Sequence, residues 1–291
     1  MINKCIICGS TEVIKLRKFQ QFFQKQCKNC DLAFLSPLPS DAVIRSFNTK
    51  KYNSIESQFA SVQVGEKLYK RAISCLDFLT IQGLKQNLKV LDIGTGYGFY
   101  LKAFKDRGYI PLGIEVLKAP ARFARKSFKL NILEGDYSKH KFKDTTFDLI
   151  TLFDVFEHFR NPIKIVNKIK LELKKKGLVI IQTPNINSLI YKITGKKWFW
   201  LLIPQHLFLY SIQSLKYLLE KNGFEIFKIQ SWDAFEEFAY NILWVLGVKN
   251  KGKTQIIHLF LYMIIWLFYP LSLLWCNFGF GGELTIYARK K

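Results

Sequence analysis

Two CxxC pairs near the start of the chain could bind a metal ion. Cys5 and Cys8 form the first pair and Cys27 and Cys30 the second, with 18 residues between the pairs. The thiolates of both pairs can meet on one ion, and four thiolates complete the tetrahedral shell of a structural zinc site. Such a shell keeps no open coordination position, so we expect Zn²⁺ here to be structural. Disulfide bonds are the alternative, which a reducing compartment disfavours.

A glycine-rich turn follows a short apolar run in the segment KVLDIGTGYGFYL, residues 89–101. Gly94, Gly96 and Gly98 stand in D-x-G-x-G-x-G spacing. Glycines are needed where a backbone turns sharply and approaches a ligand that a Cβ would touch. An apolar strand, a glycine-rich turn and a helix start together indicate the first unit of a nucleotide-binding α/β fold. For this motif alone, an ordinary tight turn is the alternative.

Three further apolar runs read as strands that end in acidic residues. Glu115 ends the second strand, 21 residues after Gly94, where a carboxylate can accept hydrogen bonds from both ribose hydroxyls. Asp136 ends the third strand and Asp154 the fourth. Because ligands bind at the carboxyl ends of the strands in open α/β sheets, we expect these side chains to converge on one crevice. Helix N-capping is the alternative for Asp136 and Asp154.

The four motifs, in this order, resemble the class I S-adenosylmethionine (SAM)-dependent methyltransferases, in the subgroup whose fourth strand leads into a Glu-His pair, here Glu157 and His158. The resemblance covers about residues 65–232 and the last ten residues, and the cysteines add an N-terminal four-cysteine zinc ribbon. It implies that SAM is the cofactor. The implied SAM-binding residues are Asp92, then Gly94, Thr95 and Gly96 at the methionine end, Glu115 at the ribose, Asp136 and Tyr137 at the adenine, and Asp154 under the methionine portion.

The elements that must position these residues are those of an α/β fold with a Rossmann-like, seven-stranded methyltransferase sheet. We expect a zinc ribbon over residues 1–36, a helical linker that covers the SAM pocket over 37–85, and the methyltransferase core over 86–291. In the linker, residues 65–79 are the clearest helix and Tyr52 lies in a plausible covering position. Two insertions interrupt the core, at 185–210 and at 233–282, the latter a hydrophobic helical insertion between the sixth and seventh strands.

The second insertion holds an apolar run long enough to suggest a transmembrane helix, residues 256–276. The strands on either side must return to one sheet, however, and the other apolar stretch, residues 238–248, is too short to span a bilayer. We therefore expect a helical hairpin that serves as a substrate lid, as buried core or as a peripheral membrane contact through residues 238–276.

Methyl transfer from SAM is a direct displacement, to which an enzyme contributes alignment and exclusion of water. A hydroxyl acceptor also needs a base, and an imidazole suits that task near neutral pH. His158 follows the fourth strand and His206 lies in the insertion that leaves the fifth strand, so we predict these two as catalytic candidates. A structural role at a helix start is the alternative for His158.

Composition limits the classes of partner. Hydrophobic residues make up 49% of the 291 residues, which excludes a disordered chain. The formal net charge is +22, but only eight of the 44 basic residues are Arg. Because Arg is preferred for bidentate phosphate recognition, the excess of Lys indicates solvated faces more than a nucleic-acid groove. The charge still favours attraction to anionic lipid surfaces or phosphorylated substrates.

We therefore predict a SAM-dependent methyltransferase that acts on a small-molecule, sugar or lipid-linked biosynthetic intermediate. The opening residues do not read as a signal peptide, so we expect a cytoplasmic location, with membrane association left open. Two alternatives remain. The ribbon and the net charge favour an rRNA or tRNA methyltransferase, and a non-catalytic zinc-ribbon interaction protein is the other.

Overall fold

A computed structural model describes residues 3–44, 46–47, 62–142, 146–247 and 255–291. These residues form two compact units, which we describe separately. Unit 1 comprises Met1–Pro39, Gln182–Leu218 and Lys228–Ile286, and unit 2 comprises Ser40–Ile181, Leu219–Phe227 and Tyr287–Lys291. The predicted covering residue Tyr52 lies outside the described residues.

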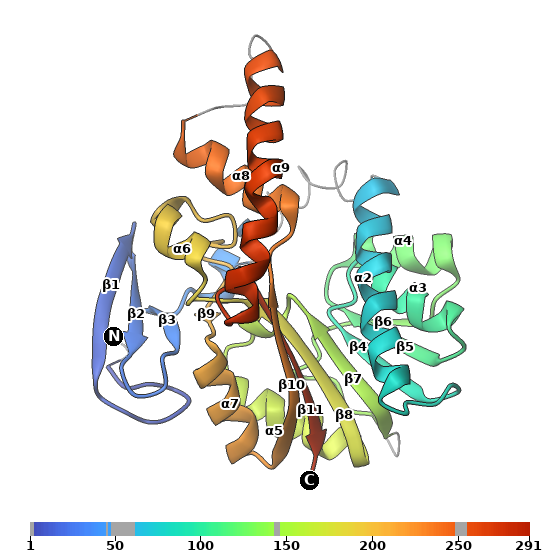
Figure 1. Cartoon of the computed structure of the whole chain (residues 1–291). Helices are drawn as coiled ribbons and strands as arrows, with labels where there is room; N and C mark the ends of the chain where they lie inside the picture. The colour runs from blue at the N-terminus through green and yellow to red at the C-terminus, as the bar shows by residue number, and fades with distance from the viewer. Residues whose placement is uncertain (1–2, 45, 48–61, 143–145, 248–254) are drawn as a thin grey trace. The chain divides into compact units, whose positions relative to one another are not determined.

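Most of the strands belong to one seven-stranded sheet (Figure 1). In the order in which they lie in the sheet, they are β10 (Phe224–Trp232), β11 (Glu283–Lys290), β8 (Leu173–Pro184), β7 (Phe147–Phe153), β4 (Lys89–Ile93), β5 (Ile110–Glu115) and β6 (Ile132–Glu134). The pairs β4–β5, β4–β7 and β5–β6 are parallel. This arrangement confirms the predicted α/β methyltransferase sheet.

Unit 2 surrounds its strands with helices formed by amphipathic segments. They include α2 (Val62–Ile81), α3 (Phe99–Asp106), α4 (Lys118–Phe128) and α5 (Pro162–Glu172). Helix α2 packs on α3, α3 on β5, and α4 on β5 and β6 (Figure 1). Buried side chains from α2, α3 and the strands, among them Leu79, Phe104 and Ile180, form the core between these layers. The carboxyl ends of β4, β5, β6 and β7 are thereby held by a packed scaffold.

Helix α5 shows how local sequence sets the ends of an element. Asn161 is its N-cap: the side-chain oxygen accepts a hydrogen bond from the Lys164 amide at 3.0 Å, and Pro162 opens the helix. The helix ends at Glu172, and β8 begins at Leu173. The amino group of Lys174 pairs with Asp148, at 2.8 and 2.9 Å from its two carboxylate oxygens.

Unit 1 contains a second, four-stranded sheet built on the N-terminal ribbon. Its strands lie in the order β1 (Val13–Phe19), β2 (Phe22–Cys27), β3 (Ala33–Ser36) and β9 (Phe208–Leu209). The pairs are antiparallel. The short strands β3 and β9 complete the sheet because Ala33 and Phe34 pair with the insertion that follows β8.

Two helices of the second insertion, α8 (Phe235–Val245) and α9 (Gln255–Asn277), also belong to unit 1 and pack against each other. They share a buried apolar cluster with α6 (Leu189–Thr194), to which Phe238, Leu243 and Ile265 contribute. Among the residues that the structure describes, no helix combines the length and the hydrophobicity that crossing a bilayer requires. The structure also contains the 3₁₀ helices η1 (Phe156–His158) and η2 (Gly195–Lys197), and the helix α7 (Ile212–Lys221).

Candidate functional site

The glycine-rich turn after β4 has three glycines with positive φ, at 70° for Gly94, 53° for Gly96 and 82° for Gly98. They are glycines for different reasons. A Cβ on Gly94 would lie 2.5 Å from Cγ2 of Val155, and one on Gly98 would lie 2.7 Å from Cβ of Ala124. Around Gly96, in the part of the chain that the structure describes, no atom apart from those of its two chain neighbours lies within 4 Å of the position that a Cβ would occupy. Packing therefore excludes side chains at the outer two positions, whereas Gly96 borders open space that a ligand could fill.

The carboxylate of Glu115, at the end of β5, is hydrogen-bonded to this turn. One carboxylate oxygen accepts a hydrogen bond from the Gly96 amide at 2.8 Å, and the other accepts one from the Leu117 amide at 2.8 Å. The residue is 5% exposed. Burial raises the pKa of the Glu115 carboxyl, and the backbone hydrogen bonds oppose that rise. The geometry places an oriented acid beside Gly96, and the contact of Glu115 with a ribose stays a prediction.

Asp92 lies on β4, two residues before Gly94. Its side chain is buried, and one oxygen accepts a hydrogen bond from the Thr151 hydroxyl on β7 at 2.7 Å. Burial raises the pKa of Asp92 to about 6. Sequence reasoning missed Thr151, although a hydroxyl between apolar neighbours in a buried strand is a readable signal. The pair ties β4 to β7 directly below the glycine-rich turn.

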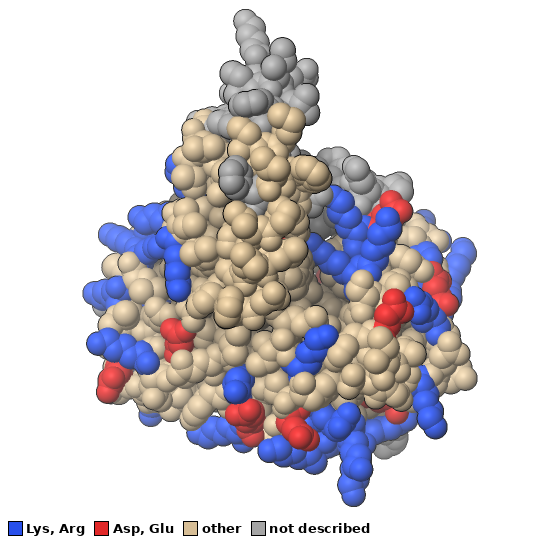
Figure 2. All heavy atoms as spheres, viewed as in Figure 1, with Lys and Arg blue, Asp and Glu red and all other residues tan. Residues whose placement is uncertain are grey.

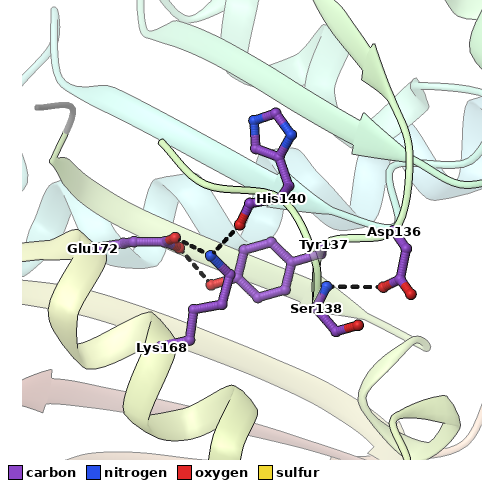
Figure 3. A network of polar contacts seen from close by, with 6 residues as sticks. All are labelled: Asp136, Tyr137, Ser138, His140, Lys168 and Glu172. Atoms are coloured by element: carbon purple, nitrogen blue, oxygen red, sulfur yellow. Dashed lines mark hydrogen bonds and ion pairs between the residues drawn. The ribbon is translucent and has the colours of Figure 1, made fainter. Parts of the chain in front are cut away.

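Asp136 and Tyr137 follow β6 and point in different directions (Figure 3). A carboxylate oxygen of Asp136 accepts a hydrogen bond from the Ser138 amide at 2.8 Å, so this acid closes a local turn. The Tyr137 hydroxyl donates to Glu172 on α5 at 2.6 Å, and the Lys168 amino group, which is bonded to Glu172, lies 4.7 Å from the centre of the tyrosine ring. Burial raises the pKa of Tyr137. This network anchors the segment after β6 on α5.

The segment after β7 carries the Asp154 and Glu-His motif. Asp154 has a φ of 55°, a left-handed conformation that Asp tolerates better than most residues. The next residue, Val155, closely approaches Gly94, which brings this segment next to the glycine-rich turn. In η1, Glu157 is fully buried, and one of its carboxylate oxygens lies 3.9 Å from Nε2 of His158, whose side chain is 26% exposed. His158 is therefore held in place yet open to solvent.

His206 belongs to unit 1, in the stretch between η2 and β9. It is 3% exposed, and its backbone amide donates to the Leu202 carbonyl at 2.8 Å. The two predicted histidines thus lie in different units: His158 is partly exposed and His206 is buried. Their catalytic roles stay predictions.

The four N-terminal cysteines meet at one point in unit 1. Their sulfurs all lie within 4.8 Å of one another, with 3.5 Å between Cys5 and Cys30 and 3.5 Å between Cys8 and Cys27. A disulfide would bring a pair to about 2.05 Å, and all four cysteines are free thiols. With zinc–sulfur bonds of about 2.3 Å, tetrahedral geometry sets the sulfurs about 3.8 Å apart. The separations therefore fit one tetrahedral ion much better than two disulfides.

The backbone after each CxxC pair adopts matching turns. Gly9, after the first pair, has a φ of 78°, and Asp31, after the second, has a φ of 63°. The Gly9 amide donates to the Cys5 carbonyl at 3.0 Å, and the Asp31 amide donates to the Cys27 carbonyl at 2.9 Å. The Asp31 side chain is fastened by Gln26 and Asn187. Two equivalent turns thus present the thiols to each other.

A family model that describes a methyltransferase domain matches residues 64–229, more than half of the chain. The matched range includes the glycine-rich turn, Glu115, Asp136 and Asp154, and it excludes the four cysteines and α9.

The chain is also similar to curated and solved proteins. It is 38% identical over 110 residues to an uncharacterized protein of Methanocaldococcus jannaschii, covering 36% of this chain and 45% of that protein. It is 29% identical over 129 residues to a ubiquinone biosynthesis O-methyltransferase of Actinobacillus pleuropneumoniae, covering 40% and 55%. The chain thus spans about half the length of the curated relatives it matches. A SAM dependent methyltransferase from Archaeoglobus fulgidus has the same fold, with a TM-score of 0.55 at 22% identity over 82% of this chain and 99% of that one.

Proposed function

Because the chain belongs to the methyltransferase-domain family, we propose that it transfers the methyl group of SAM to a small-molecule, sugar or lipid-linked biosynthetic intermediate. The observation that carries the proposal is the hydrogen bond from the Gly96 amide to the Glu115 carboxylate, beside the open space at Gly96. This is the arrangement in which a nucleoside ribose can meet a carboxylate while the rest of the ligand passes over the glycine turn.

The SAM-binding roles proposed for the other residues follow from where they lie. Gly94, Thr95 and Gly96 would line the methionine end, with Asp92 supporting the turn from within the sheet. Asp154 would lie under the methionine portion, because Val155 already touches Gly94. Asp136 and Tyr137 would border the adenine, on a segment that Glu172 and Lys168 hold in place.

When bound, SAM supplies a methyl group on a sulfonium, which an acceptor can attack directly. The residues of this chain then have to align the acceptor and exclude water. If the acceptor is a hydroxyl, a base must take its proton, and we propose His158 or His206 for that role. The side chain of His158 is partly exposed to solvent, which suits proton exchange, whereas His206 is buried.

We further propose that Cys5, Cys8, Cys27 and Cys30 hold one structural Zn²⁺, which marks the chain as a member of a zinc-ribbon subgroup. The support is the sulfur geometry and the two matching turns. Because four thiolates leave no coordination position for a substrate, the ion would stabilise the ribbon and take no part in methyl transfer.

The acceptor class is supported by the apolar insertions in unit 1 and by the small-molecule relative. The ubiquinone biosynthesis O-methyltransferase acts, by its name, in the formation of an apolar quinone. Nucleic acid is the second candidate, because the net charge is +22 and zinc ribbons often bind nucleic acids.

Labelled methyl transfer separates the two candidates. The protein is incubated with SAM carrying a radioactive methyl group and with a cell extract, and the extract is then divided into organic-soluble, water-soluble small-molecule and RNA fractions. We expect the label in one of the two small-molecule fractions, and we expect the amount of label to fall when Glu115 is substituted. Label confined to RNA would reject the proposed acceptor class, and no transfer in any fraction would favour the non-catalytic alternative.

A further inference from the structure

The outer face of α9 is apolar and exposed, which is unusual for a helix of a water-soluble unit. Met263, Leu267, Leu271, Leu274 and Phe278 follow one another at spacings of three or four residues and are 50–77% exposed. Trp266 and Leu273 widen the stripe, at 65% and 54% exposed. Single exposed apolar residues are common, but a continuous stripe of this length marks an interaction surface.

The opposite face of α9 is already used to hold the helix in unit 1. Ile265 and Cys276 are buried there, and Trp275 donates a hydrogen bond from its indole nitrogen to Asp233 at 2.9 Å. The Tyr269 hydroxyl donates to the Asp233 carbonyl at 2.6 Å. Because the inner face is fastened by these contacts, the outer stripe cannot turn inward without breaking them. The stripe is therefore free to meet something outside unit 1.

Basic residues surround this apolar surface, and α9 itself carries no charged residue. Lys192 and Lys196 are exposed on the neighbouring α6 and η2, and the Lys192 amino group lies 5.1 Å from the ring of Phe280, another exposed aromatic. The Lys197 amino group lies 3.5 Å from the carbonyl oxygens of Trp244 and Val245 at the end of α8. In the sequence, the connection between α8 and α9 adds three lysines and no acid. Figure 2 shows the column over α9 in tan, without charged side chains on the visible side.

We propose that the α8–α9 hairpin docks on an anionic lipid bilayer, with the outer stripe of α9 in the interfacial region and Lys192, Lys196 and Lys197 at the headgroups. Apolar and aromatic side chains flanked by lysines are the composition of helices that lie in a membrane interface. A second copy of this chain is the alternative occupant, and a symmetric contact would bring the stripes of two copies together. Charge favours the bilayer, because α9 carries no acid that would repel an anionic surface.

The connection of the strands limits how the hairpin can enter the bilayer. β10 precedes α8, β11 follows α9, and the two strands are neighbours in one sheet. Both ends of the insertion are therefore anchored at the same sheet, so the hairpin enters and leaves a membrane from one side. Docking of this kind does not depend on which acceptor the enzyme uses.

Vesicle sedimentation of the full-length protein tests the proposal. The probes are vesicles of phosphatidylcholine alone and of phosphatidylcholine with phosphatidylglycerol. The double variant Trp266→Glu/Leu267→Glu should bind the anionic vesicles roughly tenfold or more weakly than wild type, because its two carboxylates would enter the interface. The matched control is Ile81→Glu/Leu171→Glu, since both residues are 80% exposed in unit 2 and outside the stripe. The control should bind like wild type.

A second pair of variants tests the role of charge. Lys192→Gln/Lys196→Gln should weaken binding to anionic vesicles roughly tenfold, whereas Lys85→Gln/Lys126→Gln should change it much less. Wild-type protein should prefer anionic over neutral vesicles. Equal binding by the hairpin and control variants would overturn the proposal. A second outcome would also overturn it. If light scattering shows a wild-type dimer that does not bind vesicles, and Trp266→Glu/Leu267→Glu dissociates that dimer, the stripe contacts a second copy of the chain.

Discussion

The three glycines of the turn after β4 show how different physical demands produce one motif. Gly94 and Gly98 are required because Val155 and Ala124 occupy the space of their missing Cβ atoms. At Gly96, no described residue other than its two chain neighbours lies within 4 Å of the position that a Cβ would occupy. The sequence could predict that a turn occurs here, but it could not tell which glycine leaves room for a ligand, since that depends on side chains more than 25 residues away.

This difference between the glycines predicts that substitution at Gly96 mainly affects SAM binding and substitution at Gly98 mainly affects stability. Gly96→Val should abolish SAM binding because the side chain fills the open space, while the positive φ costs about 1 kcal/mol of stability. Gly98→Val should lower the melting temperature far more, because its side chain would collide with Ala124. Calorimetry with SAM and thermal denaturation of both variants measure these effects. Normal SAM affinity in the Gly96 variant would place the ligand elsewhere.

Asp92 predicts a specific dependence of stability on pH. Burial raises its pKa from an ordinary 3.8 to about 6 in the folded protein. The folded state then holds the proton more tightly than the unfolded chain, so this stabilisation is complete below about pH 4 and is lost as the pH rises through about 6. The loss corresponds to about 3 kcal/mol of unfolding free energy.

Asp92→Asn tests this effect, because the amide can still accept the Thr151 hydrogen bond and never ionises. The variant and wild type should have similar unfolding free energies at pH 4, and the variant should become the more stable by about 3 kcal/mol at pH 7. Urea unfolding at several pH values measures the difference. Asp77→Asn, at an exposed acid, should show no such trend. A difference that does not vary with pH would contradict the buried, raised-pKa carboxyl.

The two histidines can be separated kinetically. Alanine at the histidine that acts as the base should lower turnover by about 10²- to 10⁴-fold and leave SAM affinity near wild type. His140→Ala, at a histidine of the loop after β6, serves as the control. Normal turnover in both the His158→Ala and His206→Ala variants would exclude both as the base and indicate an acceptor that is nucleophilic without deprotonation.

At the scale of elements, long periodic segments were predictable and short pairings were not. The strands β4, β5 and β7 and the helix α9 follow from apolar runs and flanking glycines. The strands β3 and β9 contain four and two residues, too few to show a period, and β9 pairs with β3 across about 170 residues of sequence. Just past the end of α5, Lys174 pairs with Asp148, a tertiary contact that no local pattern shows.

The ribbon predicts one zinc ion per chain. Elemental analysis of the purified protein should give one equivalent, and Cys27→Ser/Cys30→Ser should lose it because two of four ligands are removed. Hydrogen exchange should then accelerate in β1, β2 and β3, whose turns the ion would hold. Cys75→Ser, at a buried cysteine of unit 2, should keep the full equivalent of zinc. A metal-free wild type with the same exchange protection would contradict the zinc proposal.

At the scale of the whole molecule, the order of the motifs predicted more than the composition did. The spacing of the glycine-rich turn, Glu115, Asp136 and Asp154 predicted both the sheet and the strand ends that carry the candidate site. Composition only bounded the partner: a charge of +22 with few arginines is compatible with several anionic surfaces. The sequence predicted an apolar hairpin at residues 238–276. It could not predict which face of α9 is exposed, because that depends on the tertiary contact of Asp233 with the other face.

SAM should bind between Gly96 of the glycine-rich turn and the carboxylate of Glu115. Titration calorimetry on wild type and Glu115→Gln tests this binding most directly. Glu115→Gln removes the charge but keeps the size of the side chain, so loss of charge-assisted hydrogen bonds to the ribose should weaken SAM binding by about 1.5–3 kcal/mol, or roughly ten- to a hundredfold. The control is Glu134→Gln, at an acid that ends β6 and pairs with Arg125. Wild type and the control should bind SAM, and Glu115→Gln should show a marked loss of SAM affinity. Absence of SAM binding in wild type, or equal affinity in all three proteins, would contradict this prediction.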